Sequence, residues 1–111
     1  MTGPRRRRTA KFTRGLAKYM LRLYVTGTTR KSLHAIQNVR RICEEHLKGR
    51  YDLEIVDLYK NVALARGDQI IAAPTLVKRR PMPLRRLIGD MSDEPSVLLG
   101  LGLRPEGAHL D

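Results

Sequence analysis

Two alternating segments that enclose a helix-length amphipathic segment restrict the fold of this chain more than any other feature. Residues 20–26 place apolar side chains at every second position, and residues 51–59 do so first on one face and then, from Val56, on the other, which is the period of a half-buried β-strand. Residues 32–47 instead place them at the three- and four-residue spacing of a helix. A strand, a helix and a second strand of these lengths form a right-handed unit with parallel strands. The first half of the chain therefore predicts an α/β fold.

A short strand-like run follows at residues 75–77, directly after Pro74 and shortly before Pro81 and Pro83. Proline cannot donate a hydrogen bond to a sheet, so it belongs at the first residue of a strand or on an edge. The bond that precedes a proline is also the one peptide bond in which a cis geometry is readily accessible. We therefore expect a fixed backbone corner at Pro74.

The rest of the second half is specified less firmly. A short helix is expected over residues 62–72, with Asn61 as its cap and Gly67 as an interruption. Residues 84–90 fit either a helix or a strand. Residues 96–103 carry apolar side chains both at helical spacing and in strict alternation, with glycines inside the run. Glycine is a poor choice for the interior of either element.

Charge is distributed unevenly in this chain of 111 residues, whose formal net charge is +11. Residues 1–18 hold seven basic groups and no acid, so the other 15 basic and 11 acidic groups leave a balance of only +4. The simpler interpretation is a solvated, disordered tail. The more specific interpretation is an arm that binds phosphates or an acidic protein surface. We expect a basic tail at residues 1–18, a folded domain at residues 19–104 and a second tail at residues 105–111.

The sequence offers little catalytic or metal-binding chemistry. The three histidines are scattered, at His34, His46 and His109. The lone Cys43 falls on the apolar stripe of the expected helix, and Asp93 and Glu94 are typical of a helix start. No glycine-rich phosphate-binding motif is present. We therefore expect neither an enzyme nor a cofactor or metal. The single thiol and the lack of a long apolar run predict a cytoplasmic protein without a membrane span.

Two basic clusters flank the predicted turn at residues 81–83, one at residues 78–80 and one at Arg85 and Arg86. A charged hairpin of this kind fits a solvated sheet edge that is protected from aggregation. It fits a docking surface for another molecule equally well. Stacking on nucleic-acid bases is less attractive, because no aromatic residue lies among these arginines.

The order of these elements resembles the thioredoxin fold, in which the proline before the third strand is cis. The redox members of that fold carry two cysteines after the first strand, where this chain has "TGTTRKS" at residues 26–32. The resemblance is closer to the KaiB family of circadian clock proteins. It is carried by "LRLYVTGTT" (21–29), "YDLEIVDLYKN" (51–61), "APTLVKRRPMPLRRLIGDMSD" (73–93) and "VLLGLGL" (97–103).

This resemblance implies a non-enzymatic clock component that switches fold and binds the ring of a KaiC-like hexameric ATPase. By binding, it would regulate the phosphorylation cycle of the ring and the exchange of its downstream partners. It implies a thioredoxin-like form, or alternatively a rearranged resting form with the order βαββααβ that assembles as a homotetramer or dimer. KaiA or a sensor histidine kinase is a further candidate partner. The expected fold-switching positions are Pro74, Pro81, Pro83, Gly89, Gly100 and Gly102. The expected partner-binding residues are Lys60, Asn61, Arg85 and Arg86. The alternative function is nucleic-acid binding by a small basic protein, with the basic tail as the binding segment.

Overall fold

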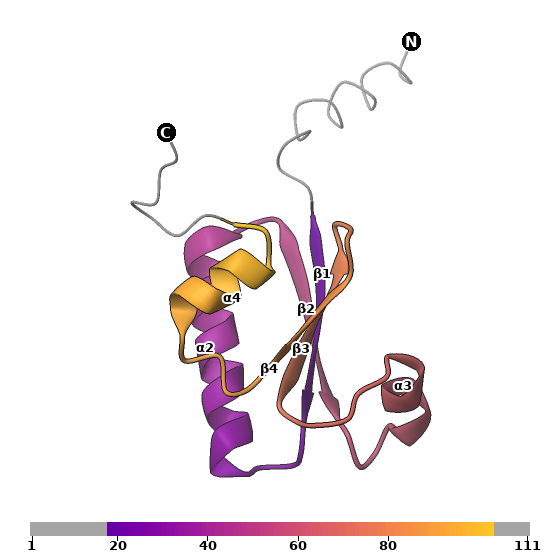
Figure 1. Cartoon of the computed structure of the whole chain (residues 1–111). Helices are drawn as coiled ribbons and strands as arrows, with labels where there is room; N and C mark the ends of the chain where they lie inside the picture. The colour runs from indigo at the N-terminus through magenta and orange to yellow at the C-terminus, as the bar shows by residue number, and fades with distance from the viewer. Residues whose placement is uncertain (1–17, 104–111) are drawn as a thin grey trace, which may run out of the picture.

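The computed structural model describes residues 18–103, which form a four-stranded sheet with helices on both of its faces (Figure 1). In chain order the elements are β1 (Tyr19–Val25), α2 (Arg30–His46), β2 (Tyr51–Asp57), α3 (Val62–Gly67), β3 (Thr75–Arg80), β4 (Arg85–Ile88) and α4 (Glu94–Gly100). This order, βαβαββα, is the thioredoxin-like fold that the sequence predicts, and it differs from the alternative βαββααβ order. No helix among the described residues is both long and apolar enough to cross a membrane.

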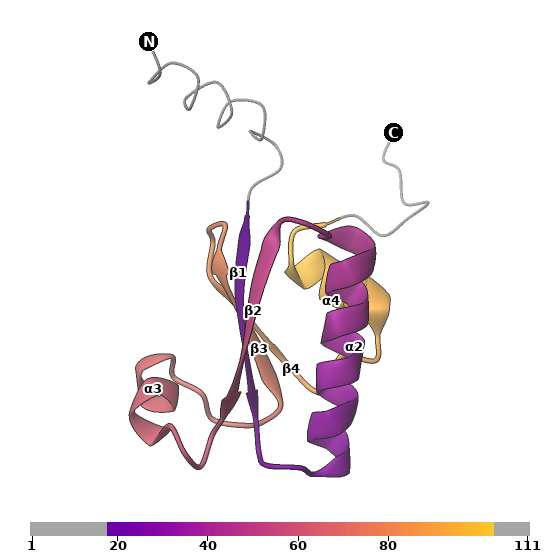
Figure 2. The same ribbon diagram turned by 180° about the vertical axis from the view of Figure 1, so that it is seen from behind.

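Strands β1 and β2 pair in parallel, from Tyr19 opposite Tyr51 to Val25 opposite Asp57, which confirms the predicted strand–helix–strand unit. Helix α2 lies against one face of this pair (Figure 2). It begins where Thr29 accepts a hydrogen bond from the Ser32 backbone N–H at 3.2 Å. Hydroxyl groups therefore start the helix in the segment where redox relatives of this fold carry their cysteines.

The sheet has the order β2-β1-β3-β4, with β3 antiparallel to both β1 and β4. Because side chains alternate along each strand, the sheet supplies two separate cores. The larger core, on the α2 and α4 side, contains Leu21, Leu23 and Leu76. The smaller core lies under α3 and consists of Tyr24, Val56, Ala65 and Val77, with Leu58 and Ile70 packed against it.

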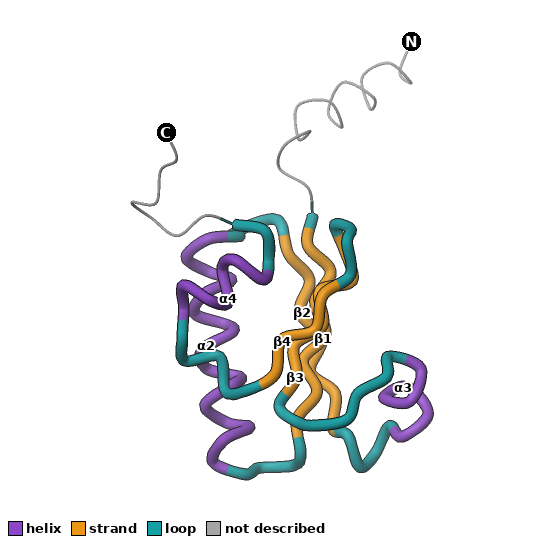
Figure 3. The backbone as a smooth tube through the Cα atoms, in the orientation of Figure 1, coloured by secondary structure: helices purple, strands orange, loops and turns teal. Residues whose placement is uncertain are grey.

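The ambiguous segments of the second half take one element each (Figure 3). Residues 85–88 form an edge strand, and residues 94–100 form a helix. Asp93 begins this helix by accepting hydrogen bonds from Ser96, as its position in the sequence predicts. The helical spacing buries Val97, Leu98 and Leu101 in the larger core, which alternation could not do for the adjacent pair.

The two glycines of this last segment have different structural reasons. A methyl group at Gly100 would overlap with Cδ2 of Leu87 and lie 2.9 Å from Cδ1, so glycine allows α4 to pack closely on β4. Gly102 has a positive φ of 82° and follows the helix, where its N–H donates to Leu99 O and the N–H of Leu103 donates to Leu98 O. This pair of bonds is the Schellman motif, which favours glycine at the left-handed position.

Helix α3 is shorter than the sequence predicts, because it ends at Gly67 instead of continuing to residue 72. Asn61 occupies the cap position, but its side chain accepts no capping hydrogen bond and instead donates to Asp57 O at 3.0 Å. Residues 69–74 then lead into β3 through a positive φ of 59° at Gln69 and a cis bond before the buried Pro74. The corner predicted at Pro74 is confirmed.

Gly102→Ala should lower the free energy of unfolding by about 1 kcal/mol, because a Cβ disfavours the left-handed conformation at this position. Urea unfolding monitored by circular dichroism measures the change. Gly67→Ala is the matched control, since Gly67 lacks a positive φ and a Cβ there would meet no atom within 4 Å. The control should be neutral or slightly stabilising. Equal losses in both variants would contradict the Schellman assignment.

Candidate partner-binding surface

A single carboxylate organises the polar side chains on the α3 side of the sheet. Asp68, which directly follows α3, accepts hydrogen bonds from the Tyr24 hydroxyl at 2.6 Å and from Arg22 Nη1 at 3.0 Å. Its second oxygen accepts from Arg79 Nη1 at 3.1 Å. Its side chain is only 12% exposed. Asp68 therefore joins the end of α3 to strands β1 and β3.

These contacts keep the Asp68 carboxylate ionised. Burial by itself would raise its pKa, but hydrogen bonds from Tyr24 and Arg22, together with the charges of Arg22 and Arg79, hold the pKa below the ordinary aspartate value. The Tyr24 pKa is raised, first by burial and then by its hydrogen bond to Asp68. The hydroxyl therefore stays protonated and remains a donor to the carboxylate.

Arg86 ties the edge strand β4 to the same region. Its Nε donates to the backbone carbonyl of Asp68 at 2.9 Å, and its Nη2 donates to Gln69 Oε1 at 3.1 Å. Arg85, one position earlier, points to the opposite face of the sheet, which it shares with Leu87 of the larger core. The structure thus separates two arginines that the sequence groups together.

Exposed apolar side chains lie at both ends of α3 and at the end of β4. Ile71 is 89% exposed, and Tyr59, Val62 and Ile88 are also exposed. A cleft of about 260 Å³ opens along α3, where Tyr59, Val62 and Arg66 contribute to its walls. We call the following set the α3 surface: Tyr59, Lys60, Asn61, Val62, Arg66, Ile71, Arg86 and Ile88.

The partner-binding residues predicted from sequence therefore separate into two groups. Lys60 and Asn61 lie exposed at the start of α3 and Arg86 lies on the same side, so all three belong to the α3 surface. Arg85 does not belong to it. The predicted fold-switching positions are distributed along the second half, with Pro81 and Pro83 in the β3–β4 turn and Gly89 directly after β4.

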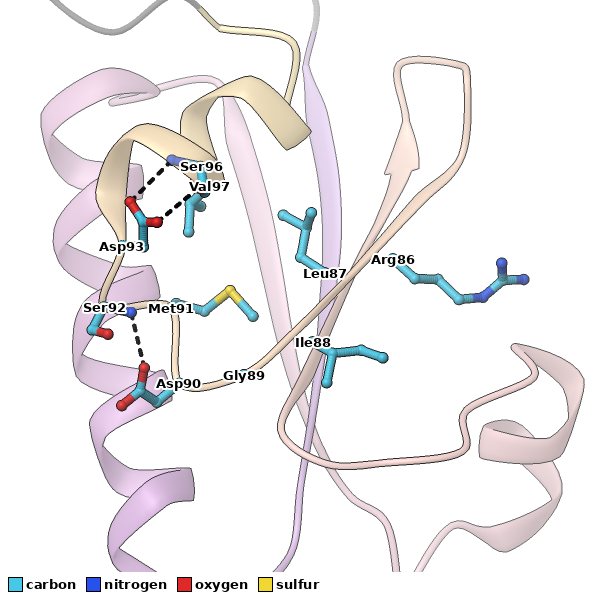
Figure 4. A pocket seen from close by; sticks show the side chains of 10 residues that line it. All are labelled: Arg86, Leu87, Ile88, Gly89, Asp90, Met91, Ser92, Asp93, Ser96 and Val97. Atoms are coloured by element: carbon cyan, nitrogen blue, oxygen red, sulfur yellow. Dashed lines mark hydrogen bonds between the residues drawn. The ribbon is translucent and has the colours of Figure 1, made fainter.

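A second hollow, of about 300 Å³, lies between β4 and the start of α4 (Figure 4). Leu87, Met91 and Val97 give it an apolar lining, while the Arg86 side chain extends away from it. Its two carboxylates are already engaged in local structure. Asp90 accepts from the Ser92 N–H at 3.0 Å, and Asp93 accepts from Ser96. This hollow therefore has an apolar lining, but neither of its carboxylates is free to act as an acid or a base.

One cluster among the described residues resembles a metal site. Glu45, His46 and Glu94 bring ligand atoms within 4.8 Å of one another. Glu94 is already held by Arg41 at 2.8 Å and by His46 at 2.9 Å, and the hydrogen bond from Arg41 is the main cause of its lowered pKa. These contacts connect α4 to α2, so we assign the cluster a structural role.

The single thiol, at Cys43, is also unsuited to act as a catalytic nucleophile. Cys43 is fully buried in the larger core. Burial, with a smaller contribution from Glu44, raises its pKa to about 12. A thiol that remains protonated in an apolar core is a poor nucleophile. Within residues 18–103 the thiol therefore acts as a small apolar side chain, as the helical stripe predicts.

Sequence reasoning missed the central residue of this surface. Asp68 is the only acid between residues 58 and 89, a stretch that holds seven lysines and arginines. A lone acid among so many cations is a signal that could have identified it. Arg22 and Tyr24 alternate with the apolar residues of the first strand, but nothing local indicates that they meet Asp68.

Comparisons with known proteins agree with this geometry. The model of the KaiB domain family matches residues 22–103. Circadian clock protein KaiB3 of a Synechocystis strain is 47% identical over 93 residues, which cover 84% of this chain and 91% of that protein. Circadian clock oscillator protein KaiB of Synechococcus elongatus is 47% identical over 85 residues, which cover 77% of this chain and 83% of that protein.

Solved structures with the same fold include the N-terminal domain of SasA from Synechococcus elongatus. It aligns with a TM-score of 0.65 at 24% identity, covering 84% of this chain and 90% of that one. Mitochondrial thioredoxin 3 from Saccharomyces cerevisiae aligns with a TM-score of 0.63 at 11% identity, covering 85% of this chain and 88% of that one. At these identities the likeness shows the thioredoxin-like fold alone.

Asp68→Asn should lower the free energy of unfolding at pH 7 by about 1–3 kcal/mol, because Arg22 and Arg79 lose a charged acceptor. The folded pKa of Asp68 is depressed. Its contribution is therefore complete above the unfolded aspartate pKa of about 3.9 and is lost as the pH falls through the folded value. Urea unfolding at several pH values should show the difference between wild type and variant shrinking on acidification.

Asp52→Asn is the control for this measurement. Asp52 pairs with Lys18 at 3.3 Å, but both side chains are about three-fifths exposed. Exposed pairs of this kind contribute little to stability. A loss in Asp52→Asn as large as that in Asp68→Asn would contradict the central role of Asp68.

Proposed function

This chain belongs to the KaiB family of circadian clock proteins, and from this we propose that it acts without catalysis, by binding the ring of a KaiC-like hexameric ATPase. On this proposal the chain regulates the phosphorylation cycle of the ring and the exchange of its other partners. Lys60, Asn61 and Arg86 are the proposed contact residues that sequence reasoning had identified. The α3 surface is the proposed docking face.

The observation that carries the proposal is the combination of exposed apolar side chains with the fixed guanidinium of Arg86 on the α3 surface. Interfaces favour large apolar side chains and arginine at their centres. Arg86 is held in place by the Asp68 carbonyl and Gln69, so less side-chain freedom is lost when it binds a carboxylate. On binding, the exposed apolar surface of Ile71 is buried against the partner, which contributes favourably to the free energy of association.

The cations also indicate the character of the complementary surface. Lys60, Arg66 and Arg86 are exposed on the α3 surface, and Arg79 lies beside it on Asp68. We propose that the partner presents carboxylates around an apolar contact, which speeds association by electrostatic steering. This steering weakens as the salt concentration rises.

We further propose that the second half of the chain has another arrangement, related to the homo-oligomeric resting form of the family. The candidate positions for this exchange are Pro74, Pro81, Pro83, Gly89, Gly100 and Gly102. What supports the proposal is that residues 96–103 fit helix and strand periods alike. Two arrangements of one sequence can coexist when their free energies differ by only a few kcal/mol.

Ring binding is tested by incubating the full chain with a KaiC homologue and ATP over several hours, followed by size-exclusion chromatography. We expect the wild-type chain to elute with the ring. Ile71→Asp should weaken binding at least tenfold, because it places a charge at the centre of the apolar contact. Arg66→Glu should weaken it and remove much of its salt dependence.

Two matched variants control for general effects of the substitutions. Leu33→Asp changes a 45% exposed leucine on α2, and Arg40→Glu changes an exposed arginine on the same helix. Neither residue belongs to the α3 surface, so both variants should bind as the wild type does. A chain that forms no complex with any nucleotide would refute ring binding. Equal losses in the α3 and α2 variants would refute the docking face.

The proposed rearrangement is tested by native-state amide hydrogen exchange on the free chain. We expect the amides of β4 and α4 to exchange through partial openings that leave β1, α2 and β2 protected, because the second half can unfold separately. A single opening free energy that is shared by all seven elements would contradict the proposal.

A further inference from the structure

A buried lysine without an acidic partner stands out on the face of the sheet opposite α3. Lys78 is only 4% exposed, and it shares the α2 and α4 side of β3 with Leu76. Its Nζ is not fully enclosed, but removing most of the water around an ammonium group is still costly unless an opposite charge or hydrogen-bond acceptors compensate it. Within residues 18–103 no carboxylate lies within 4 Å of Lys78, whereas Arg22, Arg41 and Arg79 all have such a partner.

A second cation opposite Lys78 makes its charge more costly. Arg85 of β4 lies directly opposite Lys78 in the antiparallel pair, so their side chains emerge on the same face of the sheet. The pKa of Lys78 is lowered, first by burial and then by the charge of Arg85. Arg85 also has no ion pair within the described part of the chain. Two cations therefore lie side by side with no compensating charge.

The backbone near the ammonium group presents the partial negative charge at the end of α4, but within residues 18–103 it accepts no hydrogen bond from Lys78. A Cβ at Gly102 would lie 3.9 Å from Lys78 Nζ, which places the ammonium beside the end of α4. The carbonyls there already accept hydrogen bonds, Leu98 from the Leu103 N–H and Leu99 from the Gly102 N–H. The carbonyl of Leu101 accepts from the Tyr19 hydroxyl at 3.0 Å.

Gly102 provides access to this ammonium group. The residue is exposed and has no side chain, so nothing at that position covers Lys78 Nζ from the solvent. We propose that Lys78 and Arg85 form a binding site for a phosphate dianion, which enters beside Gly102 and neutralises both cations. An ammonium acts as a point charge and a guanidinium as a planar fork, and together they match the oxygens of a phosphate.

The site is tested by titrating inorganic phosphate into the ¹⁵N-labelled full chain, with sodium chloride adjusted to keep the ionic strength constant. The Gly102 amide signal should shift and saturate. Lys78→Met should weaken this response at least tenfold and Arg85→Gln severalfold. Lys48→Met, which changes an exposed lysine beyond α2, should leave it unchanged. Constant ionic strength separates a specific site from general attraction to the many other cations.

A second measurement distinguishes loss of binding from loss of structure. Lys78→Met should unfold at the same temperature as the wild type or higher in phosphate-free buffer, because it removes a buried charge without a partner. Inorganic phosphate should then raise the unfolding temperature of the wild type and not that of the variant. A variant that is much less stable without phosphate would overturn the inference, because Lys78 would then have a compensating partner in the chain itself.

The source of the phosphate is distinguished by repeating the titration with O-phosphoserine. Tighter binding than inorganic phosphate assigns the site to a phosphorylated side chain, and weaker binding assigns it to the free ion. No saturable shift at Gly102, an equal response in Lys78→Met, or equal binding of the monoanion acetate would each overturn the inference. The measurement needs no partner protein, so its outcome is independent of ring binding.

Discussion

Strand β1 lies between β2 and β3, and it supplies side chains to both faces of the sheet. Leu21 and Leu23 point into the larger core, while Arg22 and Tyr24 point to the α3 side. The rest of the structure depends on this alternation, because it fixes which face α2 and α4 cover and where the polar network forms. A one-residue shift in register would exchange the two faces.

The positively charged side chains on the two faces of the sheet have different partners. On the α3 side, Asp68 accepts from Arg22 and Arg79 through its carboxylate, and from Arg86 through its backbone carbonyl. These cations are compensated and held in position. On the opposite face, Lys78 and Arg85 have no such acid among residues 18–103. The cations on the α3 side are therefore held by one acidic residue, whereas Lys78 and Arg85 lie opposite each other on the other face without one in that part of the chain.

The second half of the chain contributes residues to both charged regions, and it is also the half for which a rearrangement is proposed. The segment of residues 74–103, which includes β3, β4 and α4, contains the glycine contact at Leu87, the Schellman turn at Gly102 and three cis prolines. They also carry Arg86 and Ile88 of the α3 surface and the whole Lys78–Arg85 pair. A rearrangement of this half would therefore change both surfaces together. Binding to either surface would favour the arrangement described here, since a ligand stabilises the form that it binds.

The sequence by itself determined the strand–helix–strand unit, the corner at Pro74 and the buried position of Cys43. Each of these follows from a local period or from the chemistry of one residue. Only the tertiary structure decided that residues 94–100 are helical, because both periods were available and packing against Leu87 selected one. It also separated Arg85 from Arg86, brought Asp68 to Arg22 and Tyr24, and buried Lys78. These outcomes depend on contacts between residues far apart in the chain, which no local pattern records.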